Sequence, residues 1–302
     1  MARRLLAMGN PAAGGDDEET RRAVLDVLAD GADVVSRVLD GPGDLDRALA
    51  EHPDRDPVVL GGDGTLHRVV AALLARGELE RRPVGLIPMG TGNDLARTLG
   101  IPLDPAEAAR VVLTGVERPL DLLVAHEGGG GGGAGIVLNA VHVGVGAEAS
   151  RQATPLKPVL RRAAYAAGAL LAGVRSRGWR LRVRVDGRPV ADGRRRVLMV
   201  GIGNGASIGG GTPLAPDARP DDGLADVIVS YAVSPGARLA YGVLLRLGRH
   251  PRREDVATFR GREVVIEGEP VPANADGELH PPAARRSWTL RPAAWRIIAP
   301  PP

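Results

Sequence analysis

Two glycine-rich turns of the chain place polar side chains directly after short apolar segments. The sequence GGDGT at residues 61–65 follows an apolar run at 57–60, and GTGND at 90–94 follows another at 84–89. Glycine lets the backbone approach a ligand closely, and backbone N–H groups ahead of a helix bind phosphate oxygens. The two turns therefore predict one binding site for a polyanion.

The carboxylate of Asp63 is unusual inside such a turn. Bare phosphates would repel it, so its presence indicates a divalent cation or a transferable proton between the carboxylate and the phosphates. We therefore expect Asp63 to lie next to a metal ion or to take part in proton transfer.

Alternating strands and helices must position these turns in the first part of the chain. Their expected ranges are 5–8, 34–38, 58–60 and 84–88 for strands, and 18–28, 45–51 and 65–74 for helices. This alternation predicts a parallel sheet with helices on its faces. Ligands of such sheets bind beyond the carboxyl ends of the strands, where the glycine-bearing turns lie.

The pattern changes near residue 120, and the second part of the chain is rich in strands. Expected strands lie at 136–145, 181–185, 196–201, 225–231, 263–267 and 288–291, with helical segments at 159–174 and 235–247. We therefore predict an α/β domain at residues 1–122 and a β-rich domain at residues 123–302.

The composition excludes several kinds of chemistry. The chain has no cysteine, which excludes thiolate nucleophiles, disulfides and cysteine-ligated metals. Lys157 is its single lysine, so the first domain cannot contain a lysine-dependent phosphate loop. No apolar run is long enough for a signal peptide or a membrane span. We therefore expect a cytoplasmic protein.

The basic residues are concentrated in one region. Residues 151–196 hold 13 arginines and lysines against two aspartates. Such a region can bind nucleic acid or anionic lipid, or it can be a solvated face. Few aromatic side chains accompany the arginines, which argues against nucleic acid. The basic, apolar segment 159–174 favours peripheral contact with the inner face of a membrane; a helix packed on a sheet is the alternative.

Four motifs in a fixed order resemble the diacylglycerol kinase catalytic-domain family. They are Asn10-Pro11, GGDGT at 61–65, PMGTGND at 88–94 and DGE at 276–278, and further matches include Asn139, Asn204-Gly205 and the segment 221–227. This family includes bacterial lipid kinases and the sphingosine and ceramide kinases, and NAD kinases are more distantly similar. The resemblance covers nearly the whole chain.

The resemblance implies a two-domain fold and a lipid kinase. The N-terminal domain would be a parallel α/β sheet domain, and the C-terminal domain would be β-sandwich-like and bind the acceptor. The activity would be ATP- and Mg²⁺-dependent transfer of the γ-phosphate to a hydroxyl of diacylglycerol or a related lipid. The sequence leaves open whether the chain forms a homodimer.

The resemblance also implies which residues bind the nucleotide. Backbone amides and short polar side chains of three turns would hold ATP: Asn10, Pro11, Ala12, Ala13, Gly14, Gly61, Gly62, Asp63, Gly64, Thr65, Leu66, His67, Thr91 and Asn93. The alternative is that these are only tight turns and helix caps. His67-Arg68 stand where relatives usually carry Asn-Glu, so the detailed contacts with the nucleotide can differ.

By the same resemblance Asp276 is the catalytic base, a role that kinases commonly give to aspartate. Glu278 would orient Asp276 or a metal-bound water, and Asp63 is a rival candidate, kept as an ATP and Mg²⁺ residue. On sequence alone, Asp276-Gly277 favours a hairpin turn.

A structural Mg²⁺ site is implied at the segment 219–224. Its ligands would be the carboxylate of Asp222 and the backbone carbonyls of Arg219 and Leu224, because Mg²⁺ prefers hard oxygen ligands. An Asx turn before a strand is the alternative.

Two other functions remain open on the sequence. The chain could phosphorylate a nucleotide as NAD kinases do, or another small-molecule alcohol. It could also be a catalytically weak, nucleotide-binding regulator at a membrane.

Overall fold

The computed structural model describes residues 2–9, 17–127, 135–148 and 177–301. The chain forms two compact units, Met1–Asp121 with Pro292–Pro302, and Leu122–Arg291. Among the described residues, no helix is both long and apolar enough to cross a bilayer. The basic segment 159–174 and the turn residues 10–14 lie outside the described residues.

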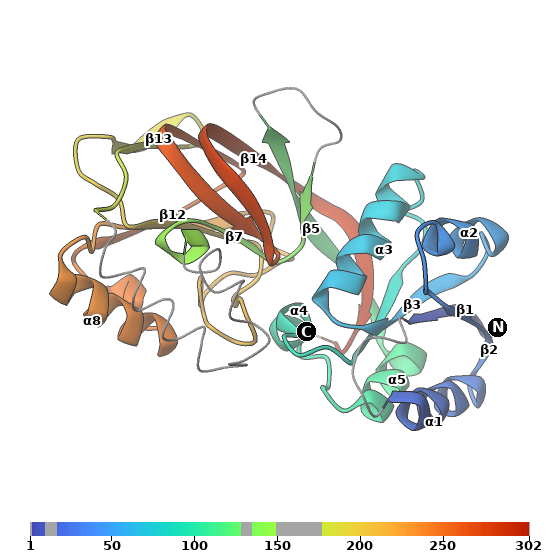
Figure 1. The fold of residues 1–302 in the computed structure, drawn as a ribbon. Coiled ribbons are helices and arrows are strands. Elements are labelled where there is room, and N and C mark those ends of the chain that lie inside the picture. The colour runs from blue at the N-terminus through green and yellow to red at the C-terminus, as the bar shows by residue number, and fades with distance from the viewer. Residues whose placement is uncertain (1, 10–16, 128–134, 149–176, 302) are drawn as a thin grey trace. The chain divides into compact units, whose positions relative to one another are not determined.

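The first unit is a parallel sheet covered by helices on both faces (Figure 1). Its strands are β1 (Arg3–Gly9), β2 (Ala32–Val38), β3 (Asp56–Gly61), β4 (Val84–Pro88) and the end of β14 (Glu278–Ala299), in the order β14-β4-β3-β1-β2. Its helices are α1 (Asp17–Ala29), α2 (Asp44–Glu51), α3 (Asp63–Ala75), α4 (Asp94–Leu99) and α5 (Pro105–Thr114). Helices α1 and α5 pack together on one face, and α2 and α3 on the other.

The burial of each strand follows from its place in this sheet. Strands β3 and β4 lie in the middle and are almost wholly buried, whereas the edge strand β2 is partly exposed. A central parallel strand is covered on both faces, so its sequence is a continuous apolar run rather than an alternating one.

The register of the strands places the glycine-bearing turns at one edge. Gly9 lies opposite Leu60, and Gly61 lies opposite Pro88. Strands β1, β3 and β4 therefore end side by side, which confirms that the GGDGT and GTGND turns share the carboxyl edge of the sheet.

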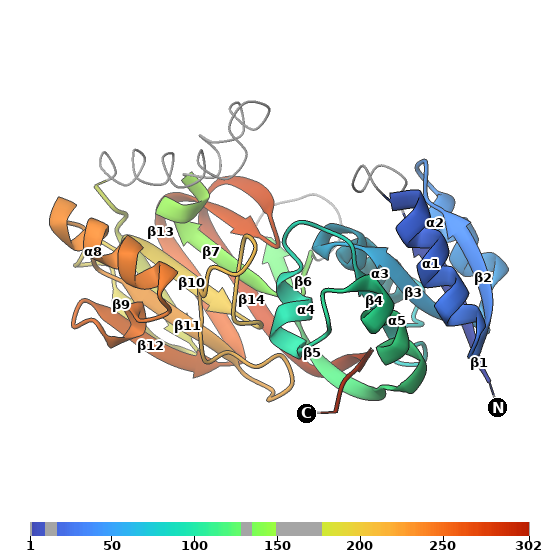
Figure 2. The ribbon, with the colours of Figure 1, turned by 90° about the horizontal axis from the view of Figure 1, so that it is seen from below.

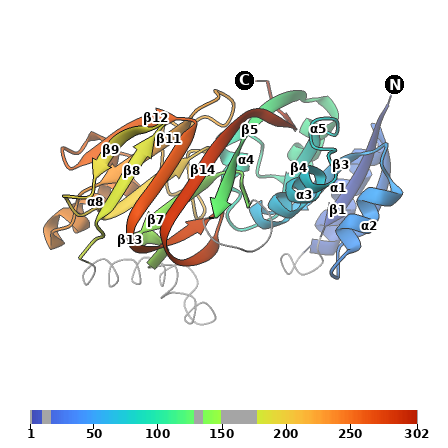
Figure 3. The same ribbon diagram turned by 90° about the horizontal axis from the view of Figure 1, so that it is seen from above.

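The second unit is built from antiparallel strands (Figure 3). They are β5 (Val116–Glu127, which begins in the first unit), β6 (Ile136–Val137), β7 (Ala140–Gly144), β8 (Leu181–Val185), β9 (Arg188–Asp192), β10 (Met199–Gly203), β11 (Ala225–Ser230), β12 (Val256–Gly261), β13 (Glu263–Ala275) and the start of β14. A helix, α8 (Pro235–Arg246), and a 3₁₀ turn, η2 (His250–Arg252), separate β11 from β12.

Strand β13 links two layers of this unit. Strand β8 pairs with the start of β13, and β7 pairs with its end. Strand β14 pairs with the opposite edge of β13. Strand β8 alternates buried and exposed residues, with Leu181 and Val183 inside and Arg182 outside. The core therefore fills with valine, leucine and isoleucine from both layers, and arginines of the basic region form the solvent face of β8.

The last residues of the chain belong to the first unit and not to the β-rich unit, which was expected to extend over 123–302. Ile297 pairs with Val84 of β4 in parallel. The buried ring of Trp295 donates from Nε1 to the carbonyl oxygen of Asp121 (3.1 Å), and the Ala293 amide donates to the Asp121 carboxylate (2.8 Å). Backbone pairing with β4 and burial of Trp295 hold this segment in place.

Candidate functional site

One candidate site, in the first unit, is the N-terminus of α3, where the GGDGT turn becomes a helix. Gly62 is its N-cap, and no side chain among the described residues caps it. Gly64 is exposed, and a Cβ atom there would meet nothing within 4 Å. The first backbone N–H groups and the positive end of the helix dipole therefore lie at the carboxyl edge of the sheet, an arrangement that binds phosphate.

The two glycine turns touch through their backbones. A Cβ atom at Gly90 would lie 2.5 Å from the Cα atom of Gly62, and one at Gly62 would lie 3.0 Å from the Cα atom of Gly90. The Met89 amide also donates to the Gly61 carbonyl oxygen (3.1 Å). A side chain at position 90 would collide with the Gly62 backbone, and one at position 62 would fit only if Gly90 moved, so the two turns form one surface.

Asp63 holds this surface together. Its carboxylate accepts hydrogen bonds from the backbone amides of Asp94 (3.1 Å) and Leu95 (3.4 Å), at the start of α4. Burial raises the pKa of Asp63, and these amides oppose that rise. The geometry thus shows the carboxylate joining the two turns, and its role toward Mg²⁺ or a proton stays a prediction.

Asn93 closes the second turn. Its side-chain Oδ1 accepts from the Gly90 amide (3.1 Å) and its Nδ2 donates to the Gly90 carbonyl oxygen (2.7 Å). The side chain is buried and the residue has a φ of 52°. Asn93 therefore shapes the turn from inside.

The other residues expected to bind nucleotide differ in what they can offer. Thr91 is exposed, and Thr65 and His67 are partly exposed, so their side chains are accessible. The side chain of Leu66 is wholly buried in the core, which leaves only its backbone to meet a ligand.

A second candidate site, in the second unit, is the hairpin between β13 and β14. Asp276 and Gly277 have φ angles of 46° and 91° and form the two-residue connection. Two positive φ angles match the turn that Asp-Gly favours on sequence alone. The expectation of a hairpin is therefore confirmed, and the turn also determines where the Asp276 carboxylate points.

Three backbone amides orient that carboxylate. It accepts from the amides of Leu138 (2.6 Å), Asn139 (3.0 Å) and Ala140 (3.0 Å), and the Asp276 amide donates to the Ala140 carbonyl oxygen (3.1 Å). Glu278 is exposed. Backbone amides thus orient the Asp276 carboxylate, and a role of Glu278 toward Asp276 or a metal-bound water stays a prediction.

A buried polar network supports the segment that holds Asp276. The side-chain Nδ2 of Asn204 donates to the Leu138 carbonyl oxygen (2.7 Å), and that of Asn139 donates to the Ser207 carbonyl oxygen. The amides of Asn204 and Gly205 both donate to the Asn139 carbonyl oxygen. The sequence contained Asn139 and Asn204 as motif matches without a role. Both asparagines lie between apolar strand segments, and buried side-chain amides are normally hydrogen-bonded. This was the signal by which the sequence indicated a buried hydrogen-bond network.

A second Asp-Gly hairpin in the same unit has the same construction. Asp186 and Gly187 join β8 to β9 with φ angles of 48° and 76°. The Asp186 carboxylate accepts from the amides of Arg262 (2.9 Å) and Glu263 (2.8 Å), and its own amide donates to the Glu263 carbonyl oxygen. The hairpin geometry alone therefore does not mark a catalytic residue.

The segment implied as a structural Mg²⁺ site is held by arginine. The Oδ1 atom of Asp222 accepts from the Leu224 amide (3.2 Å), as in an Asx turn, and its Oδ2 atom accepts from the Arg260 guanidinium. The same guanidinium lies 3.4 Å from the carboxylate of Asp226, whose pKa burial raises. Arg219 pairs with Asp221.

These contacts do not fit a bound cation at Asp222. Both carboxylate oxygens are engaged, and Arg260 already supplies the positive charge between Asp222 and Asp226. The Asx turn, the alternative reading of this segment, is present.

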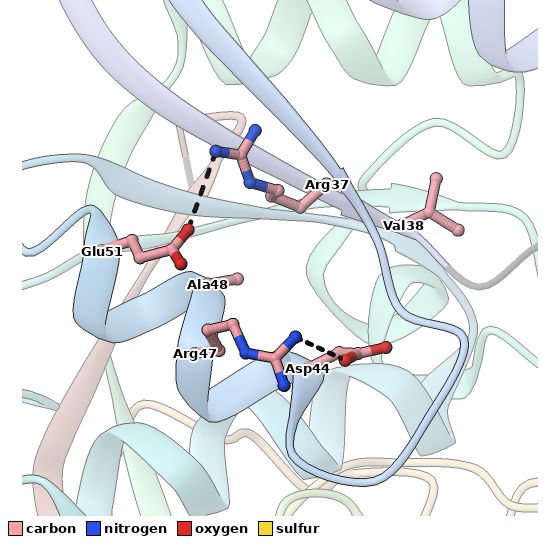
Figure 4. Close-up of a pocket in the computed structure, with 6 residues that line it drawn as sticks. All are labelled: Arg37, Val38, Asp44, Arg47, Ala48 and Glu51. Carbon is pink, nitrogen blue, oxygen red and sulfur yellow. Dashed lines mark hydrogen bonds and ion pairs between the residues drawn. The ribbon is translucent and has the colours of Figure 1, made fainter.

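A shallow pocket lies at the carboxyl end of β2, between that strand and α2 (Figure 4). Arg37 faces Glu51 (3.8 Å) and Arg47 faces Asp44 (3.4 Å). Each arginine of the pocket is thus matched by a carboxylate, so the pocket has no charge preference for an anion.

Both units match known protein domains. Residues 4–125 match the diacylglycerol kinase catalytic domain, and residues 139–299 match the YegS C-terminal NAD kinase beta sandwich-like domain. These matches confirm the expected fold class.

Similar proteins cover nearly the whole chain. A protein of Pseudomonas aeruginosa named "Probable lipid kinase YegS-like" is 35% identical over 88% of this chain and 87% of its own length. One of Stenotrophomonas maltophilia with the same name is 33% identical over 90% and 88%. The crystal structure of a diacylglycerol kinase from Bacillus anthracis has a TM-score of 0.72 at 22% identity and covers 99% of this chain and 98% of that one, a likeness of fold.

Proposed function

We propose that this chain, which belongs to the YegS-like lipid kinase family, transfers the γ-phosphate of ATP to a hydroxyl of diacylglycerol or a related lipid. The observation that carries the phosphate-donor half of this proposal is the joined pair of glycine turns at the uncapped N-terminus of α3. The family supports a lipid as the acceptor.

The amides of the GGDGT turn would bind phosphate oxygens of ATP. Asp63 and Asn93 hold both turns in shape before the nucleotide arrives, so little conformational entropy is lost on binding. Mg²⁺ that accompanies ATP would neutralise phosphate charge.

Asp276 would accept the proton of the acceptor hydroxyl. In the transfer step the hydroxyl oxygen forms a bond to the γ-phosphorus, the bond from that phosphorus to the β-γ bridging oxygen breaks, and ADP leaves. The three amides that donate to Asp276 fix its carboxylate before the substrate binds.

The test is a kinase assay with ATP, Mg²⁺ and diacylglycerol in mixed micelles. Asp276→Asn is expected to lower kcat by at least about a hundredfold, since it removes the proton acceptor. Asp186→Asn is the matched control, because it makes the same change in a hairpin of the same construction. It is expected to keep its activity, while both variants lose a similar amount of thermal stability.

Each other outcome points to a different function. Equal activity of the two variants would show that Asp276 is not the base. Phosphorylation of NAD in preference to the lipid would favour a nucleotide kinase. ATP binding without turnover on any acceptor would favour a regulator.

A further inference from the structure

Helix α8 of the second unit presents an apolar stripe to solvent. Leu239, Val243 and Leu247 are 57%, 55% and 60% exposed. They are four residues apart, so they lie above one another on a single helix face, and Figures 1 and 2 show α8 in orange on the outside of this unit. We call these three residues the apolar stripe.

The opposite face of α8 is already packed. Tyr241 is buried there, and its ring meets the ring of His250 edge-on at 5.4 Å. Ala237 and Leu245 pack against the core cluster that contains Tyr241. The apolar stripe therefore does not attach the helix to its own unit. The outer face of a solvated helix is normally polar, so this stripe calls for another explanation.

The ends of the helix are fixed before any partner binds. Ser234 caps its N-terminus by accepting from the Ala237 amide (3.4 Å), and Pro235 occupies the first turn. The exposed face is thus held on a rigid element.

The charge around the stripe is mostly positive. Residues 234–255 contain five arginines, one glutamate and one aspartate, and the aspartate, Asp255, pairs with Arg253 (2.6 Å). Arg246, Arg249 and Arg252 are exposed, and no carboxylate pairs with them in the described part of the chain. By contrast, Arg184 pairs with Glu267 and Arg196 pairs with Glu269 in the same unit.

We propose that α8 docks on the surface of an anionic lipid bilayer, with the apolar stripe at the acyl boundary and Arg246, Arg249 and Arg252 against lipid phosphates. Exposed leucine and valine beside unpaired arginines are typical of helices that lie in the membrane interface. This binding goes beyond the transfer reaction, because it needs neither nucleotide nor a reactive acceptor.

The charge also argues against a second copy of the chain as the partner. A twofold contact brings the same surface patch of both subunits together. Two patches that each carry the unpaired Arg246, Arg249 and Arg252 would then face one another and repel. Anionic lipid supplies the opposite charge.

The test is sedimentation of the full chain with vesicles of phosphatidylcholine alone or mixed with phosphatidylglycerol, without ATP. We expect the wild type to bind the anionic vesicles. The triple change Leu239→Gln, Val243→Gln and Leu247→Gln is expected to weaken this binding at least about tenfold. The triple change Arg246→Gln, Arg249→Gln and Arg252→Gln is expected to abolish the preference for anionic lipid.

The control replaces three exposed arginines elsewhere, Arg81, Arg110 and Arg188, by glutamine. This control lowers the net charge by the same amount as the arginine variant of α8 and is expected to bind vesicles like the wild type. A thermal melting curve that matches the wild type confirms that each variant is folded. As a direct readout, Leu247→Trp should fluoresce at shorter wavelength on anionic vesicles and be quenched by brominated lipid.

Three results would overturn the proposal. The first is a wild type that stays in solution with anionic vesicles. The second is equal binding by the wild type and the apolar-stripe variant. The third is a wild-type dimer that this variant converts into a monomer, which would assign the stripe to contact between copies. A lack of kinase activity would leave the vesicle result standing, so failure of the two proposals can be told apart.

Discussion

Three aspartates of this protein use their carboxylates to bind backbone amides of a neighbouring element. Asp63 binds the start of α4, Asp186 binds the start of β13, and Asp276 binds the segment before β7. Each bond is charge-assisted and ties together residues far apart in the chain. The same residue type thus serves as a structural tie at all three sites, and chemistry is proposed only for Asp276.

His142 gives a prediction at the residue scale. It lies buried on β7, and its Nδ1 atom has no hydrogen-bond partner in the described structure. Burial lowers its pKa to about 4. In the unfolded chain the imidazole of His142 binds a proton near its ordinary pKa of about 6.5. The contribution of the neutral, buried ring to folding stability is therefore fully present above pH 6.5 and is lost as the pH falls toward 4.

We expect His142→Leu to remove about 3 kcal/mol of this acid sensitivity, because the imidazole binds its proton at a pKa of about 4 in the folded chain and near 6.5 in the unfolded chain. The measurement is urea unfolding at several pH values between 4 and 7, compared with the wild type. Asp63 and His250, whose pKa values are also shifted, remain in both proteins, so the difference isolates His142. Parallel pH profiles would contradict the assignment.

At the scale of elements, Arg260 holds the turn before β11 against strand β12. It lies opposite Asp226 in the β11–β12 register and reaches Asp222 on the turn. The adjacent Arg262 donates from Nε to the Gly223 carbonyl oxygen (3.1 Å). Guanidinium groups of β12 and of the residue after it therefore hold this turn through the Asp222 carboxylate and the Gly223 carbonyl oxygen.

We therefore expect the melting temperature of the nucleotide-free wild type to be unchanged by EDTA or millimolar Mg²⁺. Arg260→Ala should lose about 1 kcal/mol, because the pair is half exposed, and Mg²⁺ should then restore part of the loss. Arg219→Ala, which breaks the exposed pair with Asp221, is the control and should not respond to Mg²⁺. A wild type stabilised by Mg²⁺ and destabilised by EDTA would show a metal site at Asp222.

At the scale of the whole molecule, the chain ends in the unit in which it begins. Strand β14 starts in the second unit and finishes as the outer strand next to β4. The first unit is therefore complete only after the second has been synthesised. Trp295, on this returning strand, is among the largest fully buried side chains described.

Trp295→Ala is expected to lower the free energy of unfolding by about 3–5 kcal/mol, since it leaves a large cavity in the core and removes a hydrogen bond to Asp121. Urea unfolding followed by circular dichroism measures this loss. Leu103→Ala, at an exposed position of the same unit, should cost well under half as much. Equal losses would show that the C-terminal strand contributes little.

The sequence by itself determined the local and periodic features of this protein. The apolar runs specified the parallel strands, their common edge followed from the order of strands and helices, and Asp276-Gly277 specified its hairpin. These features depend on neighbours within a few residues, whose spacing and conformational preferences can be read directly. The order of the motifs also identified the family.

Only the tertiary structure decided where the polar side chains point and which surfaces stay uncovered. The Asp63 carboxylate binds the start of α4, Arg260 pairs with Asp222, and the end of the chain belongs to the first unit. The apolar stripe became visible because the core covers only one face of α8. The three contacts join residues more than thirty positions apart, and the exposure of the apolar stripe depends on which face of α8 the core covers. Local periodicity encodes neither long-range contacts nor the choice of the buried face.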